Sequence, residues 1–361
     1  MKDGPIRVGI IGLNPGIHWA ATAHMPALAM LPEFEVVGCA NSSPASGQRA
    51  AEAFGLRHAF EDAQALVASD DVDLVVVTVK VPHHRALVMK ALAAGKHVYC
   101  EWPLGNGLAE AREMADAARA KGVVAAVGTQ MRTAPEVPYL RQLIAEGYVG
   151  EILSTTIVGS GMAWGAQTDA AHAYLFDKAN GATALTIPLG HTLAGVKDVL
   201  GDLADLSARM LRRRSSVLVA DTGETIPVSS DDQILVHGTL ASGVPISIHY
   251  RGGVSRGTNF LWEINGTEGD LQVVADSGHA QLARLSIRGA RGGASEMATL
   301  TPPTSVGRDW PDTPAAGNVA RLYALIAGDI RNGTRLAPSF DDAVALHVTL
   351  DAIEQASRSA I

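Results

Sequence analysis

The sequence predicts an α/β protein in which a doubly wound parallel sheet is followed by an α+β domain with an open, mainly antiparallel sheet. Apolar runs alternate with helical patterns up to about Gly128, and longer alternating segments replace them from Glu151 onward. A chain of 361 residues also suits two domains with ample core. We therefore expect a first domain over residues 1–130 and a second over residues 131–361.

The elements of the first domain follow one another in strand–helix order. Val8 to Ile11 is apolar and ends at Gly12, and a helical run follows from Trp19. Leu74 to Val79 is apolar throughout and rich in β-branched residues, which is typical of a parallel strand buried on both faces. Further strands are expected over 34–40, 97–100 and 123–127, and helices over 43–55, 82–94 and 108–120. Ser43 and Pro44 provide an N-cap and a first helical residue, and Gly55 ends that helix.

The second domain has segments of the length and alternation of antiparallel strands. Strands are expected over 152–158, 234–240, 245–250, 261–265, 270–274 and 280–287. Helices are expected over 138–146, 185–200, 316–330 and 341–357. The turns at 241–243 and 266–269 suit hairpins. Residues 288–312 are rich in Gly, Pro and Thr and are expected to form a long loop.

Composition and charge exclude several classes of protein. Hydrophobic residues make up 47% and charged residues 18%, and no apolar run approaches the ~20 residues of a membrane span. The N-terminus enters a strand without a signal-peptide pattern, and Cys39 and Cys100 fall in predicted strands as buried thiols, so we expect a cytoplasmic protein. A net charge of −8, with Arg212 to Arg214 as the only basic cluster, argues against direct nucleic-acid binding.

The corner from Arg7 to Leu28 suits the phosphates of a dinucleotide. Glycines after a strand let the backbone approach a pyrophosphate, and the N-terminus of the following helix supplies N–H groups. Leu13, Asn14 and Pro15 separate Gly12 from Gly16, which is not the usual G-x-G spacing. Taken alone, the corner is equally compatible with an ordinary strand–turn–helix.

The end of the second strand bears on the choice of cofactor. An acidic residue there would accept from the ribose 2′-OH of NAD, but the strand ends in Ala40-Asn41-Ser42-Ser43. These small groups leave room for a 2′-phosphate, and Arg49 follows in the next helix. We therefore expect NADP rather than NAD. The alternative is that Asn41 and Ser42 only build the turn and cap the helix.

Glu101-Trp102-Pro103 follows the fifth strand, at the carboxyl edge where open α/β sheets bind ligands. An indole at this edge could stack on a nicotinamide or a sugar ring, especially if Pro103 follows a cis peptide. The alternative is a rigid strand exit with a packed indole.

These features together resemble the glucose–fructose oxidoreductase, inositol dehydrogenase and rhizopine-catabolism (Gfo/Idh/MocA) family over nearly the full length. The resemblance rests on the glycine corner, the segments 94–103, 130–135 and 190–192, and the hairpin at 264–271. The lengthened corner with Trp19 and Ala20, and the tryptophan after Glu101, are most similar to the branch of the fungal galactose-regulon repressor. The family implies a Rossmann domain, an open-sheet domain, a bound NAD(P) and a sugar or polyol ligand.

On this resemblance, residues at the carboxyl edge of the first sheet are expected to bind the dinucleotide. They are Gly12, Leu13, Asn14, Gly16, Trp19, Ala20, Asn41, Ser42, Ser43, Val79, Val81, His84, Glu101, Trp102 and Gln130.

The sequence departs from the catalytic pattern of active sugar dehydrogenases in this family. Trp102 stands where they carry lysine, and Ile187 stands where they carry aspartate, four residues before His191. An alcohol that loses a hydride also needs a general base, which indole and alkyl groups cannot supply. His191 remains a candidate base, unless backbone groups merely hold it in place. Lys80, just beyond the fourth strand, is a candidate replacement, although such a lysine more often points to solvent.

Substrate contacts are expected mainly from the segment Gly159 to Gly181, which covers the ligand in this family. Aromatic faces suit the C–H surfaces of sugars, and polar groups suit hydroxyls. The expected substrate-binding residues are Trp102, Arg132, Trp164, Tyr174, Lys178 and His191. No spacing of Cys, His or Asp indicates a metal site.

We therefore expect an NAD(P)-dependent oxidoreductase that acts on a sugar, polyol or glycoside through an unusual proton-transfer group. One alternative is a catalytically silent regulator that senses dinucleotide and sugar and binds a protein. Another is NAD-dependent glycoside cleavage through transient oxidation. The open sheet of the second domain suggests a homodimer or homotetramer.

Overall fold

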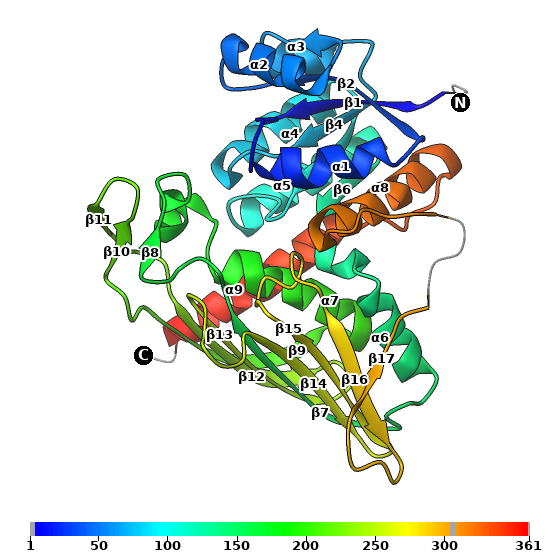
Figure 1. The fold of residues 1–361 in the computed structure, drawn as a ribbon, viewed down its shortest axis with the longest axis vertical. Coiled ribbons are helices and arrows are strands. Elements are labelled where there is room, and N and C mark those ends of the chain that lie inside the picture. Colours follow the sequence, from blue (N-terminus) through cyan, green and yellow to red (C-terminus); the bar gives the residue numbers. More distant parts are fainter. Residues whose placement is uncertain (1–3, 304–307, 360–361) are drawn as a thin grey trace. The chain divides into compact units, whose positions relative to one another are not determined.

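A computed structural model describes residues 4–303 and 308–359, which form two compact units (Figure 1). The first unit contains residues up to Gln130 and a later segment that ends at His347; the second begins at Met131 and also takes the chain from Val348 onward. Sequence order alone would assign that later segment to the second domain. Residues 1–3 and 304–307 lie outside the described residues, and the second gap falls within the loop expected over 288–312.

A six-stranded parallel sheet forms the centre of the first unit, in the order β3-β2-β1-β4-β5-β6. Its strands are β1 (Ile6–Ile11), β2 (Phe34–Ala40), β3 (His58–Ala59), β4 (Leu74–Val77), β5 (His97–Glu101) and β6 (Ala125–Gly128). This confirms the predicted doubly wound parallel sheet. All of β4 is buried, as its apolar run predicts, but the strand ends two residues early. The Thr78 hydroxyl donates to the carbonyl oxygen of Ile11 at 3.1 Å, where the chain turns away from the sheet.

Helices cover both faces of this sheet. On one face lie the π-helical turn Ala20–His24, α1 (Met25–Ala29) and α2 (Pro44–Phe54). The other face carries α3 (Ala63–Ala68), α4 (His84–Ala93) and α5 (Leu108–Lys121). The predicted ends of α2 are confirmed, because the Ser43 hydroxyl accepts from the N–H of Ser46 and Gly55 ends the helix with φ 64°.

Helix α8 (Pro314–Asn332) completes the first unit from the far end of the chain. Since α4 and α5, the helices that follow β4 and β5, both lie on the opposite face, the face of β5 and β6 beside α1 needs another cover. Tyr99 and Ala126 on these strands belong to one buried cluster with Val319 and Tyr323 of α8. Burial of this apolar surface explains why the later segment groups with the first unit.

The second unit is built on an eight-stranded sheet in the order β17-β16-β15-β14-β7-β13-β12-β9. Its strands are β7 (Ile152–Ser160), β9 (Leu203–Leu211), β12 (Gln233–Leu240), β13 (Pro245–Arg251), β14 (Phe260–Gly266), β15 (Gly269–Ala275), β16 (Ser286–Arg291) and β17 (Ala298–Leu300). Every neighbouring pair is antiparallel except β13 and β7, which confirms the predicted mainly antiparallel sheet. A small second sheet contains β8 (Gln167–Thr168), β10 (Ser216–Val219) and β11 (Glu224–Pro227).

Helices α6 (Glu136–Ala145) and α7 (Gly190–Leu200) accompany the large sheet on one face (Figure 1). Short helical turns are Val81–His83, Gln130–Thr133, Ala173–Phe176, Lys178–Asn180 and Leu185–Leu189. The last helix, α9 (Phe340–Ser359), begins in the first unit and ends in the second.

Some predicted boundaries in the second half are wrong. The strand expected over 280–287 begins only at Ser286, because residues 280–285 form an irregular turn in which Ala280 and Leu285 are buried. The loop expected over 288–312 contains the rest of β16 and all of β17. Strand β9 has no clear alternation of apolar residues, since it pairs with one neighbour only and most of its side chains reach solvent.

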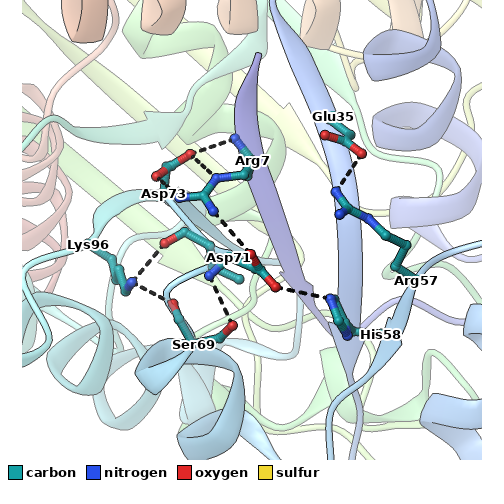
Figure 2. Close-up of polar contacts among 9 residues, drawn as sticks. Arg7, Glu35, Arg57, His58, Ser69, Asp71, Asp73 and Lys96 are labelled. Carbon is teal, nitrogen blue, oxygen red and sulfur yellow. Dashed lines mark hydrogen bonds and ion pairs between the residues drawn. The ribbon is translucent and has the colours of Figure 1, made fainter. Parts of the chain in front are cut away.

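The amino edge of the first sheet is held by charged side chains (Figure 2). Arg7 at the start of β1 donates from Nε and Nη2 to both carboxylate oxygens of Asp73, at 2.8 and 2.7 Å, and from Nη1 to Asp71 at 3.2 Å. Nearby, the Lys96 ammonium donates to the carbonyl oxygens of Ser69 and Val72. These contacts tie β1 to the segments that lead into β4 and β5.

Candidate cofactor and substrate site

The glycine corner at the carboxyl edge of β1 requires glycine at its first position. Gly12 has φ 102°, and a Cβ there would lie 2.7 Å from Cγ1 of Val79. Gly16 also has a positive φ, of 93°, but a Cβ there would meet open space. The loop that follows Gly12 buries Leu13 and leaves Ile17 90% exposed, before the chain enters the helical turn at Ala20. The corner is therefore a long loop anchored by Gly12 against the end of β4.

Asn41 braces this corner from the end of β2. Its Nδ2 donates to the carbonyl oxygens of Leu13 at 2.7 Å and Ser46 at 3.1 Å. This agrees with the alternative in which Asn41 builds the turn. The helix cap, however, is Ser43 rather than Ser42, whose side chain is exposed. The predicted cap at Ser43 is confirmed, whereas the alternative in which Ser42 caps the helix is wrong.

His84 joins the two loops that follow β4 and β5. Its Nδ1 lies 2.9 Å from the carbonyl oxygen of Pro103, and its Nε2 lies 2.9 Å from that of Val79. Burial lowers the pKa of this imidazole, although both carbonyl contacts act in the opposite direction. Val81 beside it is buried, and Lys80 is exposed at the start of the helical turn.

A buried polar network lies behind Glu101. Its carboxylate lies 2.9 Å from Nε2 of His24. Both carboxylate oxygens accept hydrogen bonds from the side-chain amide nitrogen Nε2 of Gln130, at 2.9 and 2.7 Å. The other nitrogen of His24, Nδ1, lies 2.8 Å from the hydroxyl of Tyr323 on α8. Burial acts to raise the pKa of Glu101, but the contacts with His24 and Gln130 outweigh it and lower that pKa.

The structure joins Glu101 and Gln130, both expected at the carboxyl edge of the first sheet, and it adds two groups that sequence reasoning missed. His24 and Tyr323 lie 299 positions apart, and no local pattern links them. Only the packing of α8 on the sheet makes them neighbours.

Trp102 packs on a second unforeseen histidine. The Trp102–Pro103 peptide is cis, and the indole is 5% exposed. Its ring lies 4.8 Å from the ring of His347 in α9, centroid to centroid. Burial lowers the pKa of His347 to about 4, so this imidazole is neutral at neutral pH. The packed-indole interpretation of Trp102 accounts for this geometry.

In the second unit, His191 lies in the first turn of α7 and is 3% exposed. Arg132 donates from Nε to Asp198 of the same helix at 2.7 Å. Ile187, at the position of the expected aspartate, lies in the π-helical turn that leads into α7. The helix therefore carries an imidazole and an ion pair.

The segment after β7 packs around Trp164, which is buried inside it. Trp164 is 2% exposed, has φ 60°, and donates from Nε1 to the carbonyl oxygen of Leu175 at 2.9 Å. Its ring stacks on His279 at 5.8 Å, and burial lowers the pKa of His279 to about 4. Tyr174 is half-buried next to this contact, and Lys178 pairs with Glu354 at 3.3 Å. The structure thus joins Trp164 to the Tyr174–Leu175 turn and directs Lys178 to α9.

Two further findings bear on the class of protein. None of the helices in the described ranges has the length and hydropathy of a membrane span. No group of three His, Cys, Asp or Glu side chains suited to a metal ion occurs within residues 4–303 and 308–359.

Residues 6–129 match the model of the oxidoreductase family with an NAD-binding Rossmann fold, and residues 135–275 match that of the Gal80p C-terminal domain. A dehydrogenase, aclE of Aspergillus oryzae, is 33% identical over 285 residues, which are 75% of this chain and 77% of that protein. The chain belongs to the Gfo/Idh/MocA oxidoreductase family. Its second half is of the Gal80p type, as the lengthened corner and Trp102 suggested.

Two other relatives differ from each other in role. The galactose/lactose metabolism regulatory protein GAL80 of Saccharomyces cerevisiae is 27% identical over 92% of this chain and 84% of its own. Levoglucosan dehydrogenase of Pseudarthrobacter phenanthrenivorans is 28% identical over 98% of this chain and 96% of its own.

Solved structures share the fold. A super-repressor mutant of Gal80p from Saccharomyces cerevisiae superposes with a TM-score of 0.90, 24% identity and coverage of 99% and 97% of the two chains. A levoglucosan dehydrogenase in complex with NADH and levoglucosan gives a TM-score of 0.81, 23% identity and coverage of 99% and 98%.

Proposed function

We propose that the protein binds a nicotinamide dinucleotide at the carboxyl edge of its six-stranded sheet and oxidises or reduces a sugar, polyol or glycoside. The observation that carries the proposal is the Gly12 corner, where a positive φ and a close contact with Val79 exclude any side chain. Such a corner lets backbone N–H groups face a pyrophosphate. Two buried polar atoms beside it, Nε1 of Trp19 and Oδ1 of Asn41, have no hydrogen-bond partner among the described residues, which suits a ligand with polar groups.

The dinucleotide would be held by the corner from Gly12 to Ala20, the turn from Asn41 to Ser43, and the loops around Val79 to His84 and Glu101 to Gln130. When bound, the nicotinamide supplies a hydride acceptor or donor. His84 holds the loops after β4 and β5 at a fixed separation through the carbonyl groups of Val79 and Pro103. Trp102, packed on His347, gives one of these loops a rigid apolar wall.

His191 is our proposed proton-transfer group, with Lys80 as a second candidate. An imidazole can take the proton of an alcohol as its hydride leaves, and the side chains of Trp102 and Ile187 cannot. Lys80 is exposed, so it would have to turn inward to act. Arg132, Trp164, Tyr174 and Lys178 are the proposed substrate contacts, with Trp164 acting as the buried support of its segment. Levoglucosan dehydrogenase supports a sugar substrate, because it is similar over nearly the whole chain.

Turnover tests this proposal. Purified protein with NAD⁺ or NADP⁺ and a panel of sugars, anhydrosugars and glycosides should change nicotinamide absorbance. His191→Ala should reduce that turnover by at least about 100-fold, as expected for loss of a general base, and leave dinucleotide affinity nearly unchanged. Wild-type turnover in His191→Ala would remove His191 from the mechanism. Release of an aglycone without net change in absorbance would indicate glycoside cleavage instead.

A regulatory role is the second candidate. Trp102 and Ile187 replace two groups that a dehydrogenase of this family would use, and GAL80, a regulatory protein, is similar over 92% of this chain. In this case the protein would bind dinucleotide and a protein partner without turnover. Retention of dinucleotide affinity with no turnover across the whole panel would favour it over the enzyme.

We also propose a homodimer or homotetramer formed through the open face of the eight-stranded sheet. Register places Leu235, Val158, Leu261 and Val274 in one row across this face, interrupted only by His249. An apolar row on the face away from α6 and α7 suits a second copy of the sheet. Light scattering of Leu261→Asp should then report a smaller particle than wild type.

A further inference from the structure

The turn between β2 and α2 has already used most of its hydrogen-bond donors. The Nδ2 of Asn41 donates to the carbonyl oxygens of Leu13 and Ser46. The hydroxyl of Ser46 donates to the carbonyl oxygen of Ser43 at 2.8 Å. The hydroxyl of Ser43 donates to that of Ser46 at 3.1 Å. Only the exposed hydroxyl of Ser42 remains among the side chains of this turn.

The N-terminus of α2 is equally poor in free N–H groups. Pro44 has no N–H at the first helical position. The N–H of Ser46 is capped by the Ser43 hydroxyl at 3.3 Å, and the N–H of Gly47 donates to the Ser43 carbonyl at 3.0 Å. Among these first positions, Ala45 alone has an N–H free of such a contact within the described chain. A phosphate would therefore find little of the donor array that helix N-termini usually offer.

The orientation of the Asn41 amide is set by its neighbours. Amide oxygen and nitrogen are easily exchanged in a structure, but here the nitrogen faces two carbonyl oxygens. If the two atoms were exchanged, Oδ1 would face the carbonyl oxygens of Leu13 and Ser46 with no donor between them. Oδ1 must therefore point away from these two carbonyl groups. That oxygen is buried and accepts no hydrogen bond from any residue in the described ranges. A buried acceptor without a donor destabilises the folded protein, and a donor from a ligand would remove that cost.

We propose that this turn selects NAD(H) over NADP(H), with Asn41 as the residue that determines the choice. The inference rests on the proposed dinucleotide site and reverses the preference expected from sequence. An unphosphorylated ribose offers hydroxyl donors to a turn rich in acceptors. A 2′-phosphate is an acceptor only and carries close to two negative charges, so it would lose its water without gaining donors in return.

Arg49 is the one feature of α2 that opposes this assignment. Its guanidinium is exposed and forms no ion pair within the part of the chain that the structure describes. It lies six residues beyond the cap, about 9 Å along the helix axis at 1.5 Å per residue. No hydrogen bond or ion pair joins it to the turn among the described residues, and we assign it no role in cofactor choice.

Calorimetric titration of the full chain with NAD⁺ and with NADP⁺ tests the proposal without requiring turnover. Wild type should bind NAD⁺ at least about tenfold more tightly than NADP⁺. Asn41→Ala removes both the oriented acceptor and the brace of Leu13, so it should weaken NAD⁺ binding about tenfold more than NADP⁺ binding, because only the unphosphorylated ribose uses the acceptor. Arg49→Gln is the matched control on the same helix, and it should change neither affinity.

Thermal unfolding without ligand shows whether Asn41→Ala remains folded, and Ser42→Arg provides a second variant that leaves the brace intact. Ser42→Arg should strengthen NADP⁺ binding at least about tenfold by supplying the missing donors. Tighter binding of NADP⁺ to wild type, lost in Arg49→Gln, would overturn the inference while leaving the dinucleotide site standing. Failure of both dinucleotides to bind would instead overturn the proposed function and this inference with it.

Discussion

The two edges of the six-stranded sheet use polar residues in opposite ways. At the amino edge, Arg7 pairs with both Asp71 and Asp73 from another segment of the chain (Figure 2). At the carboxyl edge, neutral side chains such as Asn41 and His84 hold backbone carbonyl groups. Buried polar atoms remain there without partners among the described residues, on Trp19, Asn41 and Thr129.

This difference indicates that opposite edges of one sheet contribute to stability and to ligand binding. Charges that satisfy one another cost little to keep at an edge and order the loops around them. Neutral braces instead fix the shape of the loops at the proposed dinucleotide site. We therefore expect substitutions at the amino edge to alter only the free energy of unfolding, whereas dinucleotide affinity should change only with those at the carboxyl edge.

The largest effect is expected at Gly12. Gly12→Ala would place a Cβ 2.7 Å from Val79 at a φ of 102°, so the corner must move. Dinucleotide binding should fall at least about 100-fold, and stability should fall by about 1–3 kcal/mol. Calorimetric titration and urea unfolding measure the two effects. Gly16→Ala is the matched control, because its φ is also positive but its Cβ has room; a loss of affinity as large as that of Gly12→Ala would refute the steric explanation.

The second largest effect is expected from acid, which should lower the stability of the folded protein by protonating His347 at the carboxyl edge. The unfolded chain binds a proton on this residue near its ordinary pKa of 6.5, whereas the folded protein does so only near 4. Stability from this group is therefore complete above pH 6.5 and is lost as the pH falls towards 4, by about 1–3 kcal/mol. His347→Phe keeps an aromatic ring against Trp102 and should flatten this part of the pH–stability curve. A curve for His347→Phe parallel to that of wild type would contradict the assignment.

Asp73→Asn should produce the smallest of the three effects and should act on stability alone. It removes the bidentate partner of Arg7, and we expect a loss of about 1–2 kcal/mol in urea unfolding with unchanged dinucleotide affinity. Glu35→Gln, which breaks the more exposed pair with Arg57, is the control and should cost less than about 0.5 kcal/mol. A change in dinucleotide affinity in Asp73→Asn would break the distinction between the two edges.

Much of the fold follows from local patterns in the sequence. The apolar run of β4, the Ser43–Pro44 start of α2 and the Gly55 end of that helix depend on neighbouring residues only, and the structure confirms them. Strands such as β9, with one neighbour and mixed side chains, carry no such signal. The membership of α8 in the first unit also had no local signal, because an amphipathic helix does not specify which sheet it covers.

For the candidate site, the sequence by itself determined which residues stand at the carboxyl edge. Glycine in the corner and Trp102 and Ile187 in place of catalytic groups are visible without coordinates. Only the tertiary structure decided what their side chains do. It placed Trp102 on His347, joined Glu101 to His24, and turned the Asn41 amide towards Leu13 and Ser46. The physical reason is that strand and helix patterns arise from contacts a few residues apart, whereas hydrogen-bond partners and aromatic contacts depend on segments that meet only when the chain folds.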